Sequence, residues 1–368
     1  MRRSYAPVNG LLLATLLALT GIGFVIFLSA SIGLVARDTG ADFKSVVFTQ
    51  TIFGLLPGLL GMYVLSRIPH KKLRIWSLYL LAFSILLSFA VFIPGLGFAH
   101  GGAQRWISLG SHTFQPSELL KIAVIIYLAA WFAMVGQKAS TFRSGALPFL
   151  VVIGITGAVL FSQPDIDTFM VLFASGLAMY IAAGAKIRHV ILILLLCTLL
   201  TGVLTLVFPY VKQRMQTFIN PTADSLGSGY QIQQSLIAVG SGGFFGKGFG
   251  KSTQKFNYLP EPIGDSVYAV ASEEFGFIGS VGLLFFFFLL GHQGLRVASR
   301  ARDLFGRYLA VGIVMMFLSQ AFINIGAMLG ILPLSGITLP FISHGGTALL
   351  FTLTEAGILL SISRSARE

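Results

Sequence analysis

Long runs of apolar residues alternate with short polar intervals along almost the entire chain. Ten runs approach or exceed the ~20 residues that an α-helix needs to cross a bilayer. They lack the short alternating segments of a membrane β-barrel. The pattern predicts an all-α, polytopic membrane protein. The expected spans are residues 11–35, 45–66, 75–93, 117–135, 146–162, 168–185, 190–208, 267–290, 308–330 and 342–363.

One polar interval, residues 209–264, is much longer than the others and follows the seventh expected span. A loop of this length without secondary structure is usually functional or disordered. Within it, residues 230–239 have the composition of a short amphipathic helix lying at the membrane interface. We expect one integral membrane domain over residues 1–368 that contains this loop.

Basic residues occupy every second interval between the spans, including both chain ends. The positive-inside rule places these intervals, and both termini, in the cytoplasm, so that loop 209–264 is extracellular. One missed span would break the alternation, so the charges support the count of ten. The 16 of 25 Lys and Arg residues concerned are Arg2, Arg3, Arg67, Lys71, Lys72, Arg74, Lys138, Arg143, Lys186, Arg188, Arg296, Arg300, Arg302, Arg307, Arg364 and Arg367.

Composition and charge exclude several other classes of protein. Hydrophobic residues make up 55% of the chain and charged residues 10%, with a net charge of +12. The basic residues are dispersed in short loops, which argues against nucleic-acid binding and for some attraction to anionic membrane lipid. The first apolar run is too long for a signal peptide, so we expect a retained helix. Cys197 is the single cysteine, which excludes a disulfide within the chain.

Carboxylates gather on the side opposite the basic residues. Ionisable groups near apolar segments are costly and usually functional, so we expect the site on this side. The ten of 13 carboxylates that fall there are Asp38, Asp42, Glu118, Asp165, Asp167, Asp224, Glu261, Asp265, Glu273 and Glu274.

Asp265 lies directly before the eighth expected span, four residues after Glu261. One interpretation is a helix N-cap, because Asp accepts hydrogen bonds from the free amides there. The other is a general base, since a long basic loop precedes it and Glu273 and Glu274 follow it. Two such carboxylates cannot both face lipid cheaply. Because Asp265 and Glu273 are about two helical turns apart, a shared cavity is expected.

A second stretch places Arg105 and Trp106 before the fourth span, and Glu118 and Lys121 in its first turns. Glu118 and Lys121 have the i,i+3 spacing of an interfacial ion pair. Alternatively, Arg105 and Lys121 hold an anionic group, since Arg grips phosphate as a fork and Lys as a point charge. Trp106 is explained equally well as an interface anchor.

Asp165 and Asp167 lie between two spans in the sequence Gln-Pro-Asp-Ile-Asp-Thr. A capped turn explains them well, whereas a divalent cation site is the weaker alternative. Near the last span, Ser343 and His344 suggest a nucleophile, but adjacent side chains of a helix diverge, so we expect polar contacts there. Glu355, inside this span, needs an inward partner.

Several motifs then fall into a familiar order: Gly-Ala-Gln-Arg-Trp-Ile-x-Leu-Gly (102–110), Gln-Pro-Ser-Glu-x-x-Lys (115–121), Gln-Pro-Asp (163–165), a Gly-rich run (229–248), Leu-Pro-Glu…Asp (259–265), Glu-Glu-x-Gly (273–276) and Leu-Pro-Phe-x-Ser-x-Gly-Gly (339–346). Together they resemble the SEDS family (shape, elongation, division and sporulation) over nearly the whole chain. The rod-shape members are the expected nearest group, although the subfamilies share these motifs.

The resemblance implies a ten-span fold in the bacterial cytoplasmic membrane. It also implies a peptidoglycan glycosyltransferase that polymerises lipid II at the outer face, with roles in elongation and cell shape, and a class B penicillin-binding protein as partner. The family's essential aspartate falls on Asp265, its Arg and Lys on Arg105 and Lys121, and its Gln-Pro-Asp aspartate on Asp165. The chain departs from the family pattern at Asp167, where Gly is usual, and at His344, where Tyr is common; Gly264 and Ser266 replace the usual neighbours of Asp265.

In the expected mechanism, lipid II enters laterally between helices, Arg105 and Lys121 neutralise the departing diphosphate, and Asp265 takes the proton of the attacking 4-hydroxyl. The linkage inverts in one displacement. Supporting or substrate-binding positions are expected at Glu118, Asp165, Glu261, Glu273, Glu274 and Ser343. A divalent cation assisting the leaving group is an open alternative. The competing functions are a lipid II flippase and a scaffold for the penicillin-binding protein; one-sided carboxylates argue against a flippase, whose binding groups usually lie near the midplane.

Overall fold

A bundle of long helices forms the protein in this computed structural model, which describes all residues except 1–7, 37–42, 101–102, 111, 222–226 and 366–368. Asp38, Asp42 and Asp224 therefore lie outside the described residues. The bundle helices are α1 (Gly10–Ile32), α2 (Phe43–Thr49) continuing into α3 (Leu56–Arg67), α4 (Lys71–Phe89), α5 (Pro116–Val135), α6 (Leu147–Ser162), α7 (Ile166–Ala182), α8 (Ile187–Val207), α11 (Val267–Arg300), α12 (Leu304–Met328) and α13 (Gly346–Ser365).

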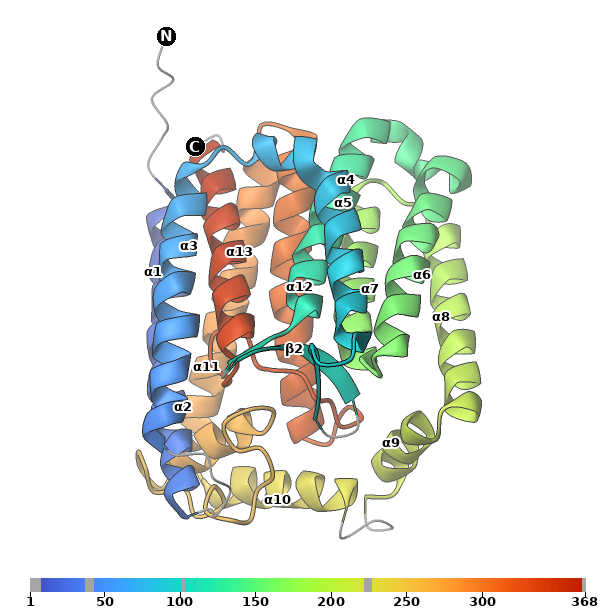
Figure 1. The fold of residues 1–368 in the computed structure, drawn as a ribbon. Helices are drawn as coiled ribbons and strands as arrows, with labels where there is room; N and C mark the ends of the chain where they lie inside the picture. Colours follow the sequence, from blue (N-terminus) through green and yellow to red (C-terminus); the bar gives the residue numbers. More distant parts are fainter. Residues whose placement is uncertain (1–7, 37–42, 101–102, 111, 222–226, 366–368) are drawn as a thin grey trace.

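Every expected span has a helical counterpart (Figure 1). Nine helices of the described chain are long and apolar enough to cross a membrane, and α7 is a shorter apolar helix. This agreement has a physical basis, because a chain in lipid must satisfy its backbone hydrogen bonds within each segment. The protein is thus a multi-pass membrane protein. In its core, α12 packs against α5, α7 and α11, and α13 packs against α3.

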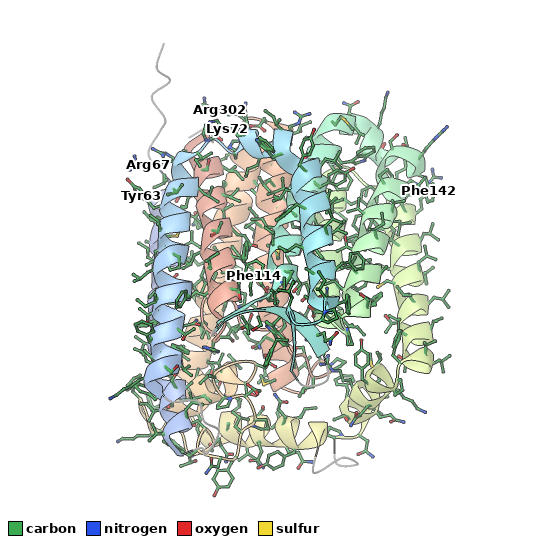
Figure 2. The ribbon with its side chains drawn as sticks, in the orientation of Figure 1. Tyr63, Arg67, Lys72, Phe114, Phe142 and Arg302 are labelled. Atoms are coloured by element: carbon green, nitrogen blue, oxygen red, sulfur yellow. The ribbon has the colours of Figure 1, made fainter. Side chains whose placement is uncertain are left out.

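The two ends of the bundle differ in charge and structure. Arg67, Lys72 and Arg302 lie at one end, which we call the basic end, together with the start of α1 and the end of α13 (Figures 1 and 2). The opposite end carries a small sheet and two further helices, and we call it the sheet end (Figure 1).

The sheet end contains structure that the sequence pattern does not predict. Strands β1 (Gly97–His100), β2 (Ala103–Leu109) and β3 (His112–Phe114) form an antiparallel sheet in that order, with Gly97 opposite Ile107 and Ile107 opposite Phe114. The long loop 209–264 is partly helical, with α9 (Pro209–Ile219) and α10 (Ser228–Ser241). The helix expected over residues 230–239 is present as α10, and its place at the membrane interface stays a prediction.

A glycine kink joins this loop to the bundle. Within α11, Gly276 has φ 64° and ψ −161°, so the helix is interrupted there. The amides of Lys247 and Gly248 donate to the carbonyls of Glu273 and Glu274, at 3.0 and 2.9 Å. The kink thus satisfies the loop backbone and fixes the loop against α11.

Candidate functional site

Asp265 lies in a loop at the sheet end, immediately before α11, and its side chain is partly exposed. Ser266, not Asp265, holds the N-cap position of α11, so the capping interpretation is wrong. Neighbouring segments hold the loop by its backbone. Asn324 of α12 donates to the Asp265 carbonyl at 2.8 Å, and Ser343 donates to the Gly264 carbonyl at 2.8 Å.

Ser343 therefore positions the loop of Asp265. It is buried, and its hydroxyl also accepts from the Leu339 amide at 2.8 Å. The adjacent His344 amide donates to the Ile263 carbonyl at 2.7 Å, and its ring stacks on Phe27. Burial lowers the pKa of His344 to about 4. These are the polar contacts that the sequence predicts for this pair.

Asp265 meets two charged side chains beside Gly336. A methyl group on Gly336 would lie 3.6 Å from Asp265 Oδ2, 3.8 Å from Arg214 Nη2 and 3.8 Å from Asp167 Oδ2. Arg214 Nη1 donates to both carboxylate oxygens of Asp167, at 3.1 and 2.9 Å. The Gly336 amide also donates to Asp167, at 3.0 Å. The missing side chain of Gly336 thus leaves the space in which these groups converge.

Arg105 projects from β2 toward the start of α7. Its Nη1 lies 3.8 Å from Asp165 Oδ1, its Nε donates to the Gln163 carbonyl at 3.3 Å, and its Nη2 donates to the Pro164 carbonyl. Asp165 also accepts from the Thr168 amide as the N-cap of α7, as a capped turn predicts. Its Oδ2 is buried without a hydrogen-bond partner.

Electrostatics make Asp265 a base suited to neutral pH. Burial is the main cause of a pKa raised to about 7, and the charges of Glu261 and Asp167 raise it further. Arg214 and Arg105 act in the opposite direction. A carboxylate with this proton affinity accepts protons near physiological pH, which is what general-base catalysis requires.

Glu118 and Lys121 form the expected i,i+3 ion pair, at 3.0 Å, and both side chains are buried. Lys121 also donates to Gln320 of α12 at 3.0 Å. Gln320 is one turn from Asn324, which binds the loop of Asp265, so α12 connects the two polar clusters. Glu355 is buried in α13, and its Oε1 has no hydrogen-bond partner among the described residues, so the inward partner expected for it stays a prediction.

Glu273 and Glu274 are engaged elsewhere. The Glu273 carboxylate binds Lys247 at 2.6 Å and accepts from Ser252 and Thr253. Glu274 binds Lys255 at 2.7 Å. Both glutamates are essentially buried. The cavity expected to be shared by Asp265 and Glu273 is therefore not supported, because these loop residues enclose the Glu273 carboxylate.

A search for metal sites among the described residues finds no group of three or more His, Cys, Asp or Glu side chains placed to hold an ion. Asp165 and Asp167 are each faced by an arginine instead. The divalent cation stays a prediction.

The chain matches a known protein family over almost its whole length. The family model named for FtsW, RodA and SpoVE, described as a cell cycle protein, matches residues 10–368. The chain belongs to the FtsW/RodA/SpoVE family. This is the SEDS family that the sequence motifs indicate.

Curated relatives of this SEDS protein are similar over almost their full length. Stage V sporulation protein E of Bacillus subtilis (strain 168) is 40% identical over 97% of both chains. A probable peptidoglycan glycosyltransferase FtsW of Geobacter sp. (strain M18) is 38% identical over 95% of both. These relatives are named as a sporulation protein and as FtsW, so the expected nearness to the rod-shape members is not supported by them.

Solved structures share the fold of this SEDS protein. A chain of a structure describing polymerization and crosslinking by a peptidoglycan synthase complex has a TM-score of 0.80 and 26% identity, covering 97% of this chain and 98% of that one. The rod shape determining protein RodA of Thermus thermophilus has a TM-score of 0.71 and 25% identity, covering 98% of both chains.

Arg214 is the site residue that sequence reasoning missed. It appears in the sequence only as one of several basic residues of the long loop, with no motif around it. A signal exists in retrospect, since an additional carboxylate at position 167 of this SEDS protein needs a cation nearby.

Proposed function

We propose that this chain is a peptidoglycan glycosyltransferase that polymerises lipid II into glycan strands at the outer face of the bacterial cytoplasmic membrane. The observation that carries the proposal is the meeting of Asp265 with Arg214 and Asp167 at Gly336, directly before the start of α11. Curated relatives named as probable peptidoglycan glycosyltransferases, at 38% identity, support the reaction class.

Orientation follows from the charges of the two ends. The basic end, with Arg67, Lys72 and Arg302, faces the cytoplasm by the positive-inside rule, so both termini are cytoplasmic. The sheet end then faces outward and presents Asp265 to lipid-linked sugars whose polyprenyl tails stay in the membrane.

The reaction is a single inverting displacement. The bond from C1 of the muramoyl sugar to the diphosphate breaks as the 4-hydroxyl oxygen of the acceptor glucosamine bonds to C1. Asp265 takes the hydroxyl proton, and its raised pKa suits this step. The lipid diphosphate leaves with the electron pair of the broken bond. Arg105 stabilises the charge that develops there, and Lys121 contributes from one cluster deeper in the bundle.

Other residues support this centre. Glu118 holds Lys121, Asp165 holds Arg105, and Ser343 fixes the loop of Asp265. Glu261 adds negative charge beside the base. Glu273 and Glu274 act indirectly, by fastening the long loop to α11.

We also propose a class B penicillin-binding protein as partner. This rests on the similarity to a chain of a peptidoglycan synthase complex that combines polymerization with crosslinking. The biological process, whether elongation, division or sporulation, follows from neither the site nor the fold, and an elongation role stays a prediction.

The decisive experiment compares the wild type with Asp265→Asn, each purified with a class B penicillin-binding protein and supplied with lipid II in detergent. We expect glycan strands from the wild type and none from Asp265→Asn. Asp303→Asn, which makes the same chemical change at the other end of the bundle, is the matched control and should still polymerise. Full turnover by Asp265→Asn would refute the assignment. Scrambling of lipid II in vesicles without any polymer would favour the flippase.

A further inference from the structure

Arg214 occupies an unusual position, because it belongs to an outer helix yet reaches the reaction centre. Helix α9 packs mainly against α8 and α10, and only Val211 and Thr217 of its side chains are buried. Among the ion pairs of the described chain, Arg214–Asp167 is the one that links α9 to the bundle core. The Asp167 side chain is buried, whereas that of Arg214 is 28% exposed.

The guanidinium is only partly used by Asp167. Both recorded hydrogen bonds to Asp167 come from Nη1, while Nη2 turns to the space beside Gly336. Arg has five N–H donors in a fixed fork, so one nitrogen can be anchored while another faces a second group. Here the second group is the carboxylate of Asp265, whose Oδ2 adjoins the same space.

We propose that Arg214 is a positioning residue for the transfer reaction: Asp167 anchors its guanidinium beside Asp265, and the anchored side chain holds helix α9 over the reaction centre. This inference rests on the function proposed above. It gives Asp167, where the family resemblance implies Gly, a defined role in this chain.

The charges around Asp265 give the proposal a distinctive signature. Four charged groups face it: Glu261 from its own loop, Asp167 from α7, Arg214 from α9 and Arg105 from β2. Loss of Arg214 removes a cation and leaves Asp167 uncompensated, so both changes raise the pKa of Asp265. Loss of the Asp167 charge lowers the pKa of Asp265 instead. A residue that only supports the fold would not produce opposite shifts.

The test measures kcat/KM for lipid II polymerisation against pH. The acidic limb is the part of this profile in which kcat/KM rises as Asp265 ionises. Arg214→Gln should move this limb to higher pH by roughly one unit, which lowers kcat/KM about tenfold near pH 6 and little near pH 9. Asp167→Asn should move the limb downward, since Asn keeps an acceptor for the Gly336 amide but no charge. The acidic limb of Arg214→Lys should stay closer to that of the wild type. In the double variant Arg214→Gln/Asp167→Asn the two opposite shifts should largely cancel, so its limb should return toward the wild-type position.

Lys212→Gln is the matched control, because Lys212 lies on the same helix, is exposed and forms no ion pair with the described residues. It should leave the limb in place. Amide hydrogen exchange supplies a readout independent of turnover: exchange over Pro209–Ile219 should accelerate in Arg214→Gln and not in Lys212→Gln.

The outcomes separate the two claims. An unmoved limb in Arg214→Gln, or equal shifts in the same direction for Arg214→Gln and Asp167→Asn, would overturn the positioning role while an active wild type keeps the proposed function. Unchanged exchange in α9 would overturn the anchoring. A wild type that forms no glycan, or an Asp265→Asn variant that does, would overturn the proposed function itself.

Discussion

Removing Lys255 alone should destabilise the protein strongly, because it leaves the buried carboxylate of Glu274 without its cation. Lys255 Nζ lies 2.7 Å from Glu274 Oε1, and the two side chains are 0% and 1% exposed. Nζ also donates to the carbonyl and hydroxyl of Ser29 in α1, at 3.0 and 3.2 Å. The pair therefore joins the long loop to two helices, α1 and α11.

The magnitude follows from this burial. Loss of one partner of a buried pair typically costs about 3–5 kcal/mol, since the remaining charge stays desolvated. The loss of stability in Lys255→Met should fall in this range. Lys255→Met/Glu274→Gln removes both charges. The Gln carbonyl can still accept from the Ser252 amide, and its NH2 group can donate to the Ser29 hydroxyl. The double variant should therefore be more stable than the single variant by roughly 2 kcal/mol.

Thermal unfolding in detergent, monitored by tryptophan fluorescence, measures the relative stability of the wild type, the single variant and the double variant. We expect the melting temperature of Lys255→Met to fall by several degrees and that of the double variant to recover. Limited proteolysis of residues 242–264 reports whether the loop detaches first. Lys251→Met is the matched control, because Lys251 is an exposed lysine of the same loop. If Lys255→Met melted and resisted proteolysis like the wild type, or if the double variant were no better than the single one, the reasoning would be wrong.

Three further predictions follow from other sites. Polymerisation by the wild type should rise with a midpoint near pH 7, since Asp265 must be ionised and its pKa is about 7; a flat rate profile between about pH 6 and pH 8 would contradict this. At the basic end, burial raises the pKa of Asp303, but hydrogen bonds from His70 and the Gly306 amide outweigh this effect. The pKa of Asp303 is lowered to about 2, from an ordinary value of 3.8. A depressed carboxyl pKa stabilises the fold above pH ~4 and loses this contribution as the pH falls toward 2, so Asp303→Asn should lower the melting temperature at pH 7 and show less acid dependence below pH 4. Gly276→Ala should lower the free energy of unfolding by at least ~2 kcal/mol, because φ 64° with ψ −161° is essentially restricted to Gly and the new Cβ would lie 2.3 Å from the Gly246 amide nitrogen. The control is Gly282→Ala on the same helix, where nothing lies within 4 Å of the new Cβ; it should melt like the wild type.

The bundle was predictable because the membrane constrains it so tightly. An apolar run of sufficient length has few structures available in lipid other than a helix. The short segments at the sheet end obey no such rule. Residues 97–114 form three strands of three to seven residues, and their Gly-rich sequence has no clear period-two pattern. Helix α9 was missed for the same reason, since it lies in a loop and begins at a proline.

The site was only partly predictable, because its members come from distant segments. Asp265 and Arg105 stand in recognisable motifs, and Glu118 and Lys121 reveal each other by their spacing. Arg214 pairs with a residue 47 positions away, which no local pattern indicates. The cavity expected to be shared by Asp265 and Glu273 lacks support for a related reason: sequence shows that a carboxylate needs a partner, but not which lysine of the long loop folds back to supply it.

The ion pairs divide into two kinds, and the division indicates which cations serve the reaction. Lys255 is fully enclosed by Glu274 and Ser29, so it has no donor to offer a substrate. The cations whose charges act on Asp265 are Arg214 and Arg105, each held by an aspartate at the start of α7. The fork of Arg214 keeps Nη2 beside Gly336, next to Asp265. A developing diphosphate charge needs donors that are fixed before the reaction and still available to it. Among the ion pairs of the described residues, those of Arg214 and Arg105 meet both conditions most directly, so we expect the chemistry at the sheet end. The Lys255 pair belongs to the scaffold, and Lys121 keeps the supporting role proposed for it.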